Sequence, residues 1–505
     1  MRDTTSERPA CEPRDGGIAA IRDDGSTRRA ALKGLLGAAV APLATCQSGG
    51  RSTASSPPNV ILCMADDQGW GDTGYNGHPF LQTPSLDSMS EAGLRFDRFY
   101  SGAPVCSPTR GSALTGRHPF RYGIPTANAG HMLPEEVTLA ELLRDQGYTT
   151  GHFGKWHLGT LTNDQPDGRR GGRRPEHYAP PWEHGFDECF SAEVQMPTWN
   201  PMVDQAFPSQ YWTGPGEFAT DNLDGDDSRV IMDRAVPFLR RAAESGTPFF
   251  AVIWFHTPHS PVVAGPRHRA MYAGLSEGEQ HYYGCITALD EQVGRLREEL
   301  RALGVADNTM LWYCSDNGPE GRTPHQRNNR GSSGGLRGRK RSLFEGGLRV
   351  PGILEWPQRV ASGRTTAVPC STADYLPTIA EAVGLGSGPP VRPVDGISLI
   401  PLIDGTMAVR GSRLGFQCPD GAEQGVASRL GSPDHALIGD RYKFLSYLDA
   451  ERADEDMLFD IAVDPGERHN LAGEMPELAA AMRTELEQWD ASCARSADGA
   501  DYSDG

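Results

Sequence analysis

The sequence contains no Cys-x-x-Cys pair and no cysteine–histidine spacing typical of a zinc site. Its ten cysteines are scattered over 505 residues, which does not indicate a disulfide framework. Beyond Cys11, Cys46 and Cys106, they are Cys63, Cys189, Cys285, Cys314, Cys370, Cys418 and Cys493. Cys63 and Cys314 lie in apolar runs, so we expect both to be small buried core residues.

Positive charge is also scarce, because 66 acidic residues outnumber 48 basic ones and give a formal net charge of −18. This balance argues against nucleic acid or an anionic membrane surface as the main partner. Residues 321–341 nevertheless contain no acid and many cations, which suits an anionic substrate: Arg322, Arg327, Arg330, Arg337, Arg339, Lys340 and Arg341. A second group, Arg169, Arg170, Arg173 and Arg174, fits a solvated loop or an anion-binding loop equally well.

The sequence lacks an apolar run long enough to span a bilayer, and the short run from Leu35 to Ala44 is interrupted by proline. The preceding segment, Ser26–Lys33, contains Arg28-Arg29 and resembles a twin-arginine export signal. We therefore expect residues 1–46 to engage the twin-arginine export machinery and the protein to be periplasmic or extracellular. Leu43-Ala-Thr-Cys46 also resembles a lipoprotein cleavage box, with Cys46 as a possible lipid anchor.

The 505 residues suggest two to three domain-sized units, and the pattern after a Gly/Ser/Pro-rich linker at 47–58 is typical of an α/β fold. We expect a large, mostly parallel sheet sandwiched by helices in a catalytic domain at 59–388, and a smaller α+β subdomain with an antiparallel sheet at 389–492. Residues 493–505 read as a disordered acidic tail. Expected strands are 59–64, 248–255, 309–314 and 350–355; expected helices follow Pro84 and cover 139–146, 276–303 and 374–383.

Cys106-Ser-Pro-Thr-Arg110 predicts the start of a short helix, because Pro108 suits a first turn and Ser107 can cap it. Thr115-Gly116 is a suitable stop. Cys106 then lies at the positive end of the helix dipole, with Arg110 one turn further on. The cysteine is either a tuned thiolate, a chemically altered side chain or an ordinary buried cysteine, and these residues alone do not separate the alternatives.

Two acidic pairs follow predicted strands: Asp66-Asp67 and Asp316-Asn317. The carboxyl ends of parallel strands are where open α/β sheets place their sites. Hard oxygen donors without histidine or cysteine suit Ca²⁺, or less well Mg²⁺. Each pair alone also fits ordinary turn chemistry, but the matching context favours a metal site.

Two further segments carry a cation or a proton carrier at a predicted strand end. Lys155 and His157 alternate by two, so an extended backbone would point both to one face. His256-Thr-Pro-His259-Ser-Pro261 follows another strand, and its two prolines make the loop rigid enough to position an acid.

Cys106-x-Pro108-x-Arg110 followed by Thr115-Gly116 resembles the signature of the formylglycine-dependent (type I) sulfatases, of arylsulfatase or N-acetylgalactosamine-6-sulfatase type, within the alkaline-phosphatase-like superfamily. The segment Leu336–Gly347 also matches that family, although Arg339 and Arg341 replace glycine-like residues. The resemblance implies a large α/β domain followed by a four-stranded sheet with a closing helix. It further implies that a formylglycine-generating enzyme oxidises Cys106 to formylglycine, whose hydrate is the nucleophile.

The resemblance also assigns roles to the other motif residues. Ca²⁺ would be held by Asp66, Asp67, Asp316, Asn317 and the modified Cys106, with Asp316 helping to deprotonate the attacking oxygen. Arg110 would hold the diol in place. Lys155 and Lys340 would contact sulfate, His157 would remove a proton from the sulfated intermediate, and His259 would protonate the leaving alcohol.

The sequence therefore predicts hydrolysis of sulfate esters, on a sulfated carbohydrate or an aryl sulfate. A phosphonate or phosphate monoester hydrolase of the same superfamily is one alternative, and an unconverted glycan-binding pseudoenzyme is another. Trp199, Tyr211 and Trp212 lie in a Gly/Pro-rich insertion, where they either pack the insertion down or form a sugar-stacking platform.

Overall fold

A computed structural model describes residues 56–321, 328–386, 392–418 and 432–502. The predicted export signal, the candidate lipid anchor at Cys46 and most of the predicted linker lie outside the described residues. Within the described ranges, no helix is both long and apolar enough to cross a membrane. Residues from Ser56 onward belong to one compact unit that contains both the main sheet and the C-terminal elements.

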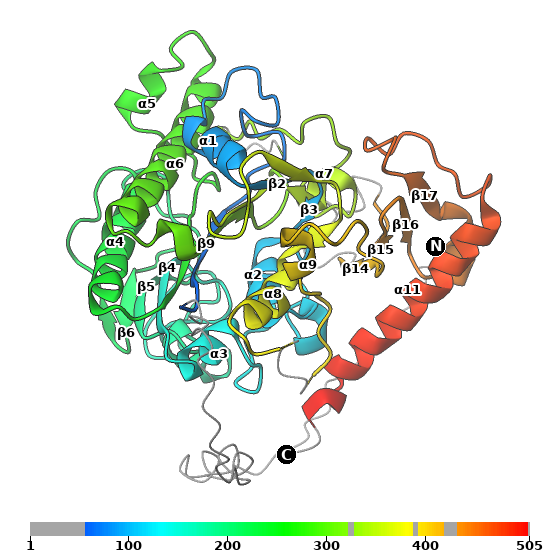
Figure 1. The fold of residues 1–505 in the computed structure, drawn as a ribbon, viewed down its shortest axis with the longest axis horizontal. Coiled ribbons are helices and arrows are strands. Elements are labelled where there is room, and N and C mark those ends of the chain that lie inside the picture. The colour runs from blue at the N-terminus through cyan, green and yellow to red at the C-terminus, as the bar shows by residue number, and fades with distance from the viewer. Residues whose placement is uncertain (1–55, 322–327, 387–391, 419–431, 503–505) are drawn as a thin grey trace, which may run out of the picture. The chain divides into compact units, whose positions relative to one another are not determined.

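The fold is mixed α/β and is built on a ten-stranded sheet whose strand order is β12-β2-β11-β9-β1-β8-β4-β5-β6-β7 (Figure 1). Strands β9, β1, β8, β4 and β5 lie parallel to one another at its centre. The parallel arrangement was predicted, and β1, β8 and β9 are three of the predicted apolar runs. The bounds are β1 Asn59–Ala65, β2 Leu94–Phe96, β4 Thr149–Lys155, β5 Glu188–Ala192, β6 Trp212–Gly214, β7 Glu217–Phe218, β8 Phe249–Trp254, β9 Thr309–Ser315, β11 Gly352–Glu355 and β12 Arg364–Thr366.

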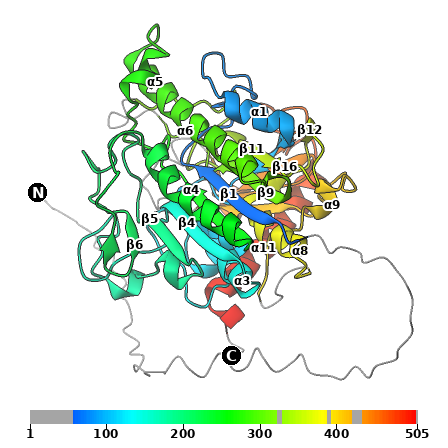
Figure 2. The same cartoon turned by 60° about the vertical axis from the view of Figure 1, so that its left-hand side comes forward.

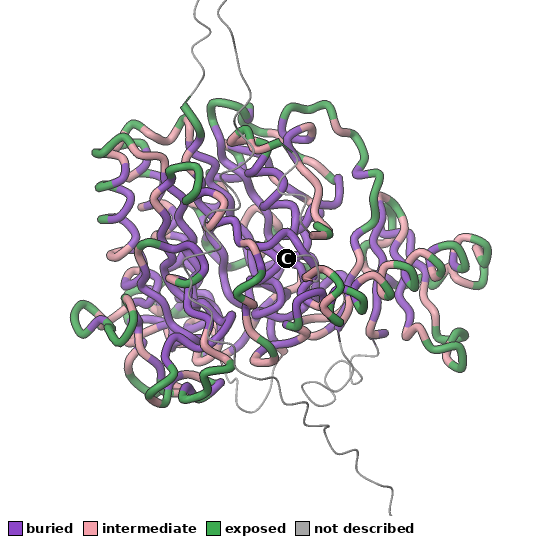
Figure 3. The backbone as a smooth tube through the Cα atoms, turned by 90° about the horizontal axis from the view of Figure 1, so that it is seen from below, coloured by how far each residue is buried: buried purple, intermediate pink, exposed green. Residues whose placement is uncertain are grey.

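Helices cover both faces of this sheet, because alternate side chains of β1 belong to two separate cores. Helices α1 (Pro84–Ala92), α4 (Asp227–Ser245) and α6 (Glu277–Ala302) pack on one face (Figure 2). Helices α2 (Cys106–Thr115), α3 (Leu139–Asp145) and α8 (Tyr375–Ala382) pack on the other. Buried segments fill the interior of the main body, and exposed segments lie mainly at its outer turns and loops (Figure 3).

The predicted helix boundaries are set by recognisable caps. Ser276 and Glu279 form the predicted capping box at the start of α6. Gly116 ends α2 in the left-handed conformation, with φ 68°, as the Thr115-Gly116 stop predicts. The predicted strand at 350–355 is divided, because Pro351 has no N–H to continue a ladder. Its first part is β10 (Arg349–Val350) and its second part, β11, runs antiparallel to β9.

Two smaller sheets complete the fold. One contains β10, β3 (Phe99–Tyr100) and β13 (Cys370–Ser371). The other is the predicted four-stranded antiparallel sheet, formed by β14 Leu414–Gln417, β15 His435–Ile438, β16 Tyr442–Ser446 and β17 Met457–Asp460. Helix α11 (Pro476–Ala497) packs on this sheet through Met482 and Leu486. Three short helices, α5 (Pro266–Ala270), α7 (Glu345–Leu348) and α9 (Ile400–Ile403), lie in connecting segments.

The prediction of a disordered tail at 493–505 is wrong for its described part. Helix α11 continues to Ala497, with Cys493 and Ser496 buried. Arg117 Nη2 then donates to Asp501 Oδ2 over 2.6 Å, and the Tyr502 hydroxyl donates to Glu136. The polar composition of the segment gave no sign of this ordered structure. Its residues form hydrogen bonds with buried polar groups of the main domain instead of burying apolar side chains.

Candidate active site

The two acidic pairs meet because β1 and β9 are neighbouring parallel strands that end at the same sheet edge. The Asp67 N–H donates to Asp316 Oδ1 over 3.0 Å, and Asn317 Nδ2 donates to Asp67 Oδ1 over 2.7 Å. All of these side chains are buried. The structure thus brings together the oxygen donors that the sequence analysis assigned to one metal site.

Three buried oxygens of this group, Asp66 Oδ1, Asp67 Oδ2 and Asn317 Oδ1, have no hydrogen-bond partner among the described residues. Buried acceptors are almost always satisfied, so orphaned oxygens at one place need a ligand. Oxygen donors of this kind fit a hard cation such as Ca²⁺ or Mg²⁺. The residues present therefore fit the metal that the sequence predicts.

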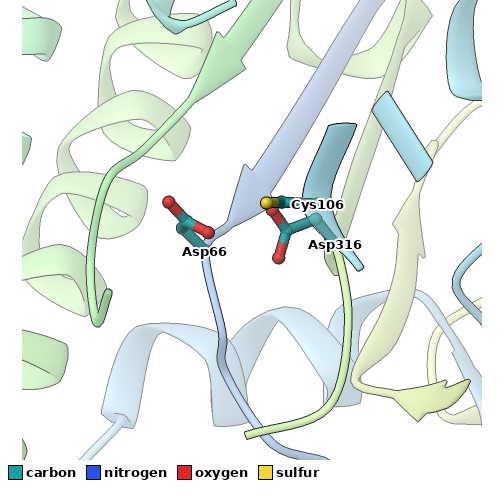
Figure 4. A group of neighbouring side chains, drawn as sticks. All are labelled: Asp66, Cys106 and Asp316. Atoms are coloured by element: carbon teal, nitrogen blue, oxygen red, sulfur yellow. The ribbon is translucent and has the colours of Figure 1, made fainter. Parts of the chain in front are cut away.

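Cys106 lies at the first turn of α2, as predicted, and joins this group (Figure 4). Its sulfur and one carboxylate oxygen each from Asp66 and Asp316 all lie within 4.8 Å of one another. Burial raises the pKa of the Cys106 thiol, against the nearby lysine charges. The predicted capping role of Ser107 is wrong: Val105 precedes the helix, and the Ser107 hydroxyl instead donates to the His157 carbonyl over 2.7 Å.

Three cations neutralise the buried acids. Lys155 Nζ lies 2.7 Å from Asp66 Oδ2, and Lys340 Nζ lies 2.7 Å from Asp67 Oδ1. Arg110 Nη2 donates to Asp316 Oδ2 over 2.6 Å, while its guanidinium lies over the Trp254 ring. Each buried acid thus has a cation within hydrogen-bond distance, and this pairing opposes the cost of burying its charge.

The carboxyl groups respond differently to this setting. Burial alone would raise the pKa of Asp67, but the charges of Lys340 and His259 hold it below its usual range. Burial and the neighbouring Asp66 charge raise the pKa of Asp316 to about 6, against the pull of Arg110. Asp316 is therefore the carboxylate of this group with the greater affinity for a proton.

His157 and His259 both line the cavity beside Cys106. His157 Nε2 donates to Asn128 Oδ1 over 2.9 Å, which leaves Nδ1 as an acceptor without a partner among the described residues. Burial holds the pKa of His157 well below its usual range, so the ring is neutral. The alternation that we expected for Lys155 and His157 is absent, since β4 ends at Lys155 and His157 is left-handed with φ 58°.

His259 Nδ1 donates to the Ser260 carbonyl over 2.7 Å, so Nε2 is the atom available for proton transfer. Nε2 lies 3.6 Å from Asp67 Oδ2. Burial lowers the pKa of His259 to about 3, and the charges of the two lysines oppose protonation further. His256 is fully buried and contacts Asp227 and Tyr211, which agrees with a purely structural hydrogen-bonding residue.

A cavity of about 620 Å³ opens onto this group and is lined by Cys106, His157, His259 and Lys340. The other predicted site residues, Asp66, Asp67, Arg110, Lys155, Asp316 and Asn317, are at most 1% exposed. These six side chains therefore lie beneath the residues that line the cavity. Such a cavity is large enough for a sugar residue rather than for an inorganic anion alone.

The sequence analysis missed several residues that line the cavity or contact its lining residues. Asn128 orients His157, and Glu320 lies beside Lys340 with its side chain 5% exposed. Gln195, Arg169 and Phe207 also line the cavity. Only Arg169 carried a signal, as part of the second arginine group. The others come from loops whose placement depends on the tertiary fold.

The aromatic insertion packs against the domain, which was one of the two alternatives, and does not form a sugar-stacking platform, which was the other. Tyr211 and Trp212 are fully buried, and Tyr211 stacks on Phe190 with ring centroids 4.2 Å apart. The Trp199 ring packs closely against Gly265: a Cβ atom added to Gly265 would lie 2.1 Å from the Trp199 ring. None of the three lines the cavity. The packing alternative is therefore correct for Tyr211 and Trp212.

The fold and the site define a mixed α/β protein with a buried, oxygen-rich centre, paired with lysine and arginine side chains, at the carboxyl end of a parallel sheet. A model of the sulfatase family matches residues 58–385, and a model of the N-sulphoglucosamine sulphohydrolase C-terminal region matches residues 338–492. The chain belongs to the sulfatase family, whose members are sulfuric ester hydrolases.

Curated relatives agree with this assignment. The chain is 33% identical over 376 residues to human N-acetylgalactosamine-6-sulfatase, covering 70% of this chain and 67% of the relative. It is 34% identical over 454 residues to bovine arylsulfatase A, covering 84% and 85%. The solved structure of Ps i-CgsB matches with a TM-score of 0.73 and 25% identity, covering 86% of this chain and 93% of the other.

A structure of the phosphonate monoester hydrolase of Agrobacterium radiobacter is also similar, with a TM-score of 0.56 and 20% identity. It covers 86% of this chain and 96% of the other. This likeness concerns the fold. The phosphorus-ester alternative therefore shares the architecture, while the family match and the curated relatives are sulfatases.

Proposed function

We propose that this protein hydrolyses sulfate esters of carbohydrates with a nucleophile derived from Cys106. The observation that carries the proposal is the position of Cys106, which begins α2 at the floor of the cavity beside Lys340, His157 and His259. A helix N-terminus and two buried lysines favour a sulfate group at this point. The two histidines provide separate sites for proton transfer.

Two groups complete the proposed chemistry. A formylglycine hydrate made from Cys106 supplies one hydroxyl to attack sulfur and a second to expel sulfate. Ca²⁺, held by Asp66, Asp67, Asp316, Asn317 and the modified Cys106, supplies charge that offsets the sulfate oxygens. The three orphaned oxygens support the metal assignment, and their carboxylate and amide chemistry suits Ca²⁺.

Other side chains of the site bind the sulfate, orient the nucleophile and transfer protons. Lys155 and Lys340 bind the sulfate oxygens, while Arg110 fixes the Asp316 carboxylate and orients the nucleophile. His157 accepts a proton at Nδ1, since its Nε2 is engaged by Asn128. Asp316, held in place by Arg110, assists deprotonation of the attacking oxygen.

His259 donates a proton from Nε2 to the leaving alcohol. The ring is neutral in the free protein, because burial and the two lysines disfavour its charged form. A bound sulfate offsets the lysine charges, and so favours protonation of His259 when the substrate arrives. Acid catalysis is thus coupled to occupancy of the anion site.

The carbohydrate part of the proposal draws on the relatives. N-acetylgalactosamine-6-sulfatase is named for a sulfated sugar, and Ps i-CgsB is solved in complex with a neocarrahexaose. The cavity size supports a sugar substrate here. An aryl sulfate can serve as a convenient surrogate, as the name of arylsulfatase A suggests.

The test compares turnover of para-nitrophenyl sulfate and para-nitrophenyl phosphate by protein made with a formylglycine-generating enzyme. We expect the sulfate ester to be the better substrate and the Cys106→Ala variant to lose turnover of both. A preference for the phosphate ester would favour the phosphorus-ester alternative. Binding of sulfated glycan without turnover by fully converted protein would favour the binding-protein alternative.

We also propose that the chain is exported in folded form through the twin-arginine pathway, with Cys46 available for lipid attachment. The Arg28-Arg29 pair and the short apolar run after it support this proposal. Replacing both arginines by lysine should retain the protein in the cytoplasm of a bacterial host. Unchanged export of that variant would refute the proposal.

A further inference from the structure

A second cavity lies between the main domain and the C-terminal elements. Its volume is about 230 Å³, and residues of α2, β14 and α11 (labelled in Figure 1) contribute to its wall. Its lining includes Ser112, His118, Asp395, Arg413, Phe416 and Trp489. Among the described residues, none lines both this cavity and the one that contains Cys106. A role for the second cavity is therefore separate from sulfate-ester hydrolysis.

His118 is a buried polar side chain at this cavity that lacks hydrogen-bond partners. The residue is 4% exposed, and neither ring nitrogen is paired with a described residue. Burial lowers the pKa of His118 to about 3, so the imidazole is neutral and offers one donor and one acceptor. Buried polar groups are almost always satisfied in native proteins. His118 therefore needs a molecule in the cavity that both accepts and donates hydrogen bonds.

Aromatic rings hold the imidazole of His118 in one position. Phe120 stacks against it with ring centroids 5.5 Å apart, and Trp489 meets it edge-on with centroids 4.7 Å apart. The His118 backbone N–H donates to Asp395 Oδ2 over 2.6 Å, which fixes the main chain as well. The Trp489 Nε1–H donates to Asp395 Oδ1 over 3.3 Å, so it is not available to the imidazole. The protein thus positions the two ring nitrogens of His118 without satisfying them.

Gly415 allows Trp489 to lie at the cavity wall. A Cβ atom added to Gly415 would lie 2.3 Å from the Trp489 ring, so this packing requires glycine. Gly415 lies within β14, where glycine weakens the strand and often marks a close approach of another group. Trp489 and Phe416 both line the cavity and provide apolar surface beside the polar imidazole.

The charged residues at this cavity are already paired. Asp395 accepts hydrogen bonds from Arg121 Nε over 2.7 Å and from Arg121 Nη2 over 2.8 Å. Arg413 donates to Glu485. Asp395 and Arg413 are the charged residues among the described residues that line the cavity. An ion would therefore lose its hydration there without gaining a countercharge, so the cavity favours a neutral molecule.

We propose that this cavity is a non-catalytic binding site for a neutral sugar ring. The hydroxyl groups of a pyranose both donate and accept, so they satisfy the nitrogens of His118, while its C–H groups pack on Trp489 and Phe416. The volume is several times the roughly 30 Å³ that one water takes in the liquid, which gives room for one ring. The inference goes beyond the proposed function, because this site takes no part in hydrolysis.

The test measures binding of unsulfated sugars to the intact protein by saturation-transfer NMR and titration calorimetry. The probes are the methyl glycosides of glucose, galactose and N-acetylgalactosamine, and an unsulfated galactose oligosaccharide. Excess inorganic sulfate is added to occupy the proposed anion site beside Cys106. We expect at least one methyl glycoside to bind. Tighter binding of the oligosaccharide would identify the ligand as the end of a glycan chain, and equal or weaker binding as a free monosaccharide.

Two variants locate the sugar. His118→Phe keeps a ring but removes both nitrogens, so it should weaken binding at least about tenfold, because hydroxyl groups of the ligand are left unpaired. Val394→Phe should weaken binding by a similar factor, because this half-exposed residue lines the cavity and a larger side chain fills it. His469→Phe is the matched control at an exposed histidine outside the cavity, and it should retain the wild-type affinity.

Two results would overturn the proposal. The first is failure of every probe to bind the wild-type protein, which would leave the cavity to water. The second is binding that His118→Phe and Val394→Phe both leave unchanged, which would place the sugar elsewhere. A crystal structure of the wild-type protein with the tightest probe locates the ring even if a variant does not fold. Aryl sulfate turnover by Val394→Phe should equal that of the wild type, so either failure leaves the proposed function standing.

Discussion

Lys155 Nζ lies 2.7 Å from Asp66 Oδ2, and both side chains are fully buried at the ends of β4 and β1. Strand β8 separates these two strands in the sheet, so the ion pair links the ends of two strands that are not neighbours. A buried ion pair is seldom a net gain over apolar packing, but loss of one partner leaves an uncompensated charge. The pair therefore makes Lys155 important for the stability of the fold.

Replacing Lys155 by Met should lower the free energy of unfolding by about 3–5 kcal/mol, because Asp66 is left buried without its closest cation. Urea denaturation in the presence of a chelator measures this loss. The double variant Lys155→Met with Asp66→Asn should recover part of it, since the charge is then removed with its partner. A loss below about 1 kcal/mol in the single variant would contradict the assigned pairing.

Replacement of His259 by Ala should affect substrates according to their leaving group. A sugar sulfate releases a poor leaving group, so loss of the acid should lower kcat/KM by about 10²–10⁴-fold. An aryl sulfate with a stable phenolate leaving group should lose far less. Steady-state kinetics with a series of aryl and sugar sulfates measures this difference. An equal loss for every leaving group would assign His259 to sulfate binding instead.

Calcium should stabilise the protein, because three buried oxygens of the site have no hydrogen-bond partner among the described residues and would coordinate the ion. At about 100 times the dissociation constant, mass action predicts an increase of about 2.7 kcal/mol in unfolding free energy. Thermal unfolding with and without Ca²⁺ measures the shift, with Mg²⁺ as a second arm expected to be weaker. Asp67→Asn should reduce the calcium shift, whereas Asp404→Asn, at an exposed pair with Arg359, should retain it. Equal shifts in both variants would place the ion elsewhere.

His435 should make stability depend on pH in the C-terminal sheet. Burial opposes its charge, but hydrogen bonds to Asp434 and Asp490 raise its pKa from 6.5 to about 9. The folded state thus binds the proton more tightly than the unfolded state. This contribution is complete below about pH 6.5 and is lost as the pH rises through about 9, with an upper bound of about 3 kcal/mol.

Chemical denaturation between pH 6 and 10 tests this linkage. His435→Gln should remove the fall in stability that belongs to this residue. His469→Gln is the control, because His469 pairs with Glu474 on an exposed surface away from the core. A stability profile unchanged by His435→Gln would show that the proton on His435 is not linked to folding.

The sequence predicted β1, β8 and β9 because each is an uninterrupted apolar run followed by polar residues at the strand end. Asp66, Asp67, Asp316 and Asn317 could be found in this way, since parallel neighbours must end together. The ion pair between Lys340 and Asp67 could not be predicted from the sequence. Lys340 lies in a loop 273 residues further along the chain, and tertiary contacts bring this loop to the site.

Other predictions from the sequence were wrong or incomplete for reasons that the structure shows. Ser107 has the composition of a cap, but its hydroxyl satisfies the His157 carbonyl, a partner 50 residues away. His157 did not continue the strand alternation because the chain turns left-handed there. Glu320 and Phe207 lie in loops with no periodic signal, so only the fold brings them to the cavity, and the same holds for Asn128 beside His157. The tail after α11 is polar because it pairs with Arg117 and Glu136 rather than with apolar side chains.

The most direct measurement is the mass of the tryptic peptide Phe99–Arg110 from protein made with a formylglycine-generating enzyme. The account predicts a mass lower by the difference between cysteine and formylglycine, and an aldehyde in that peptide that a hydrazide captures. The fraction converted should match the fraction of active sites. An unmodified thiol in every copy of a protein that still hydrolyses sulfate esters would contradict the assigned nucleophile.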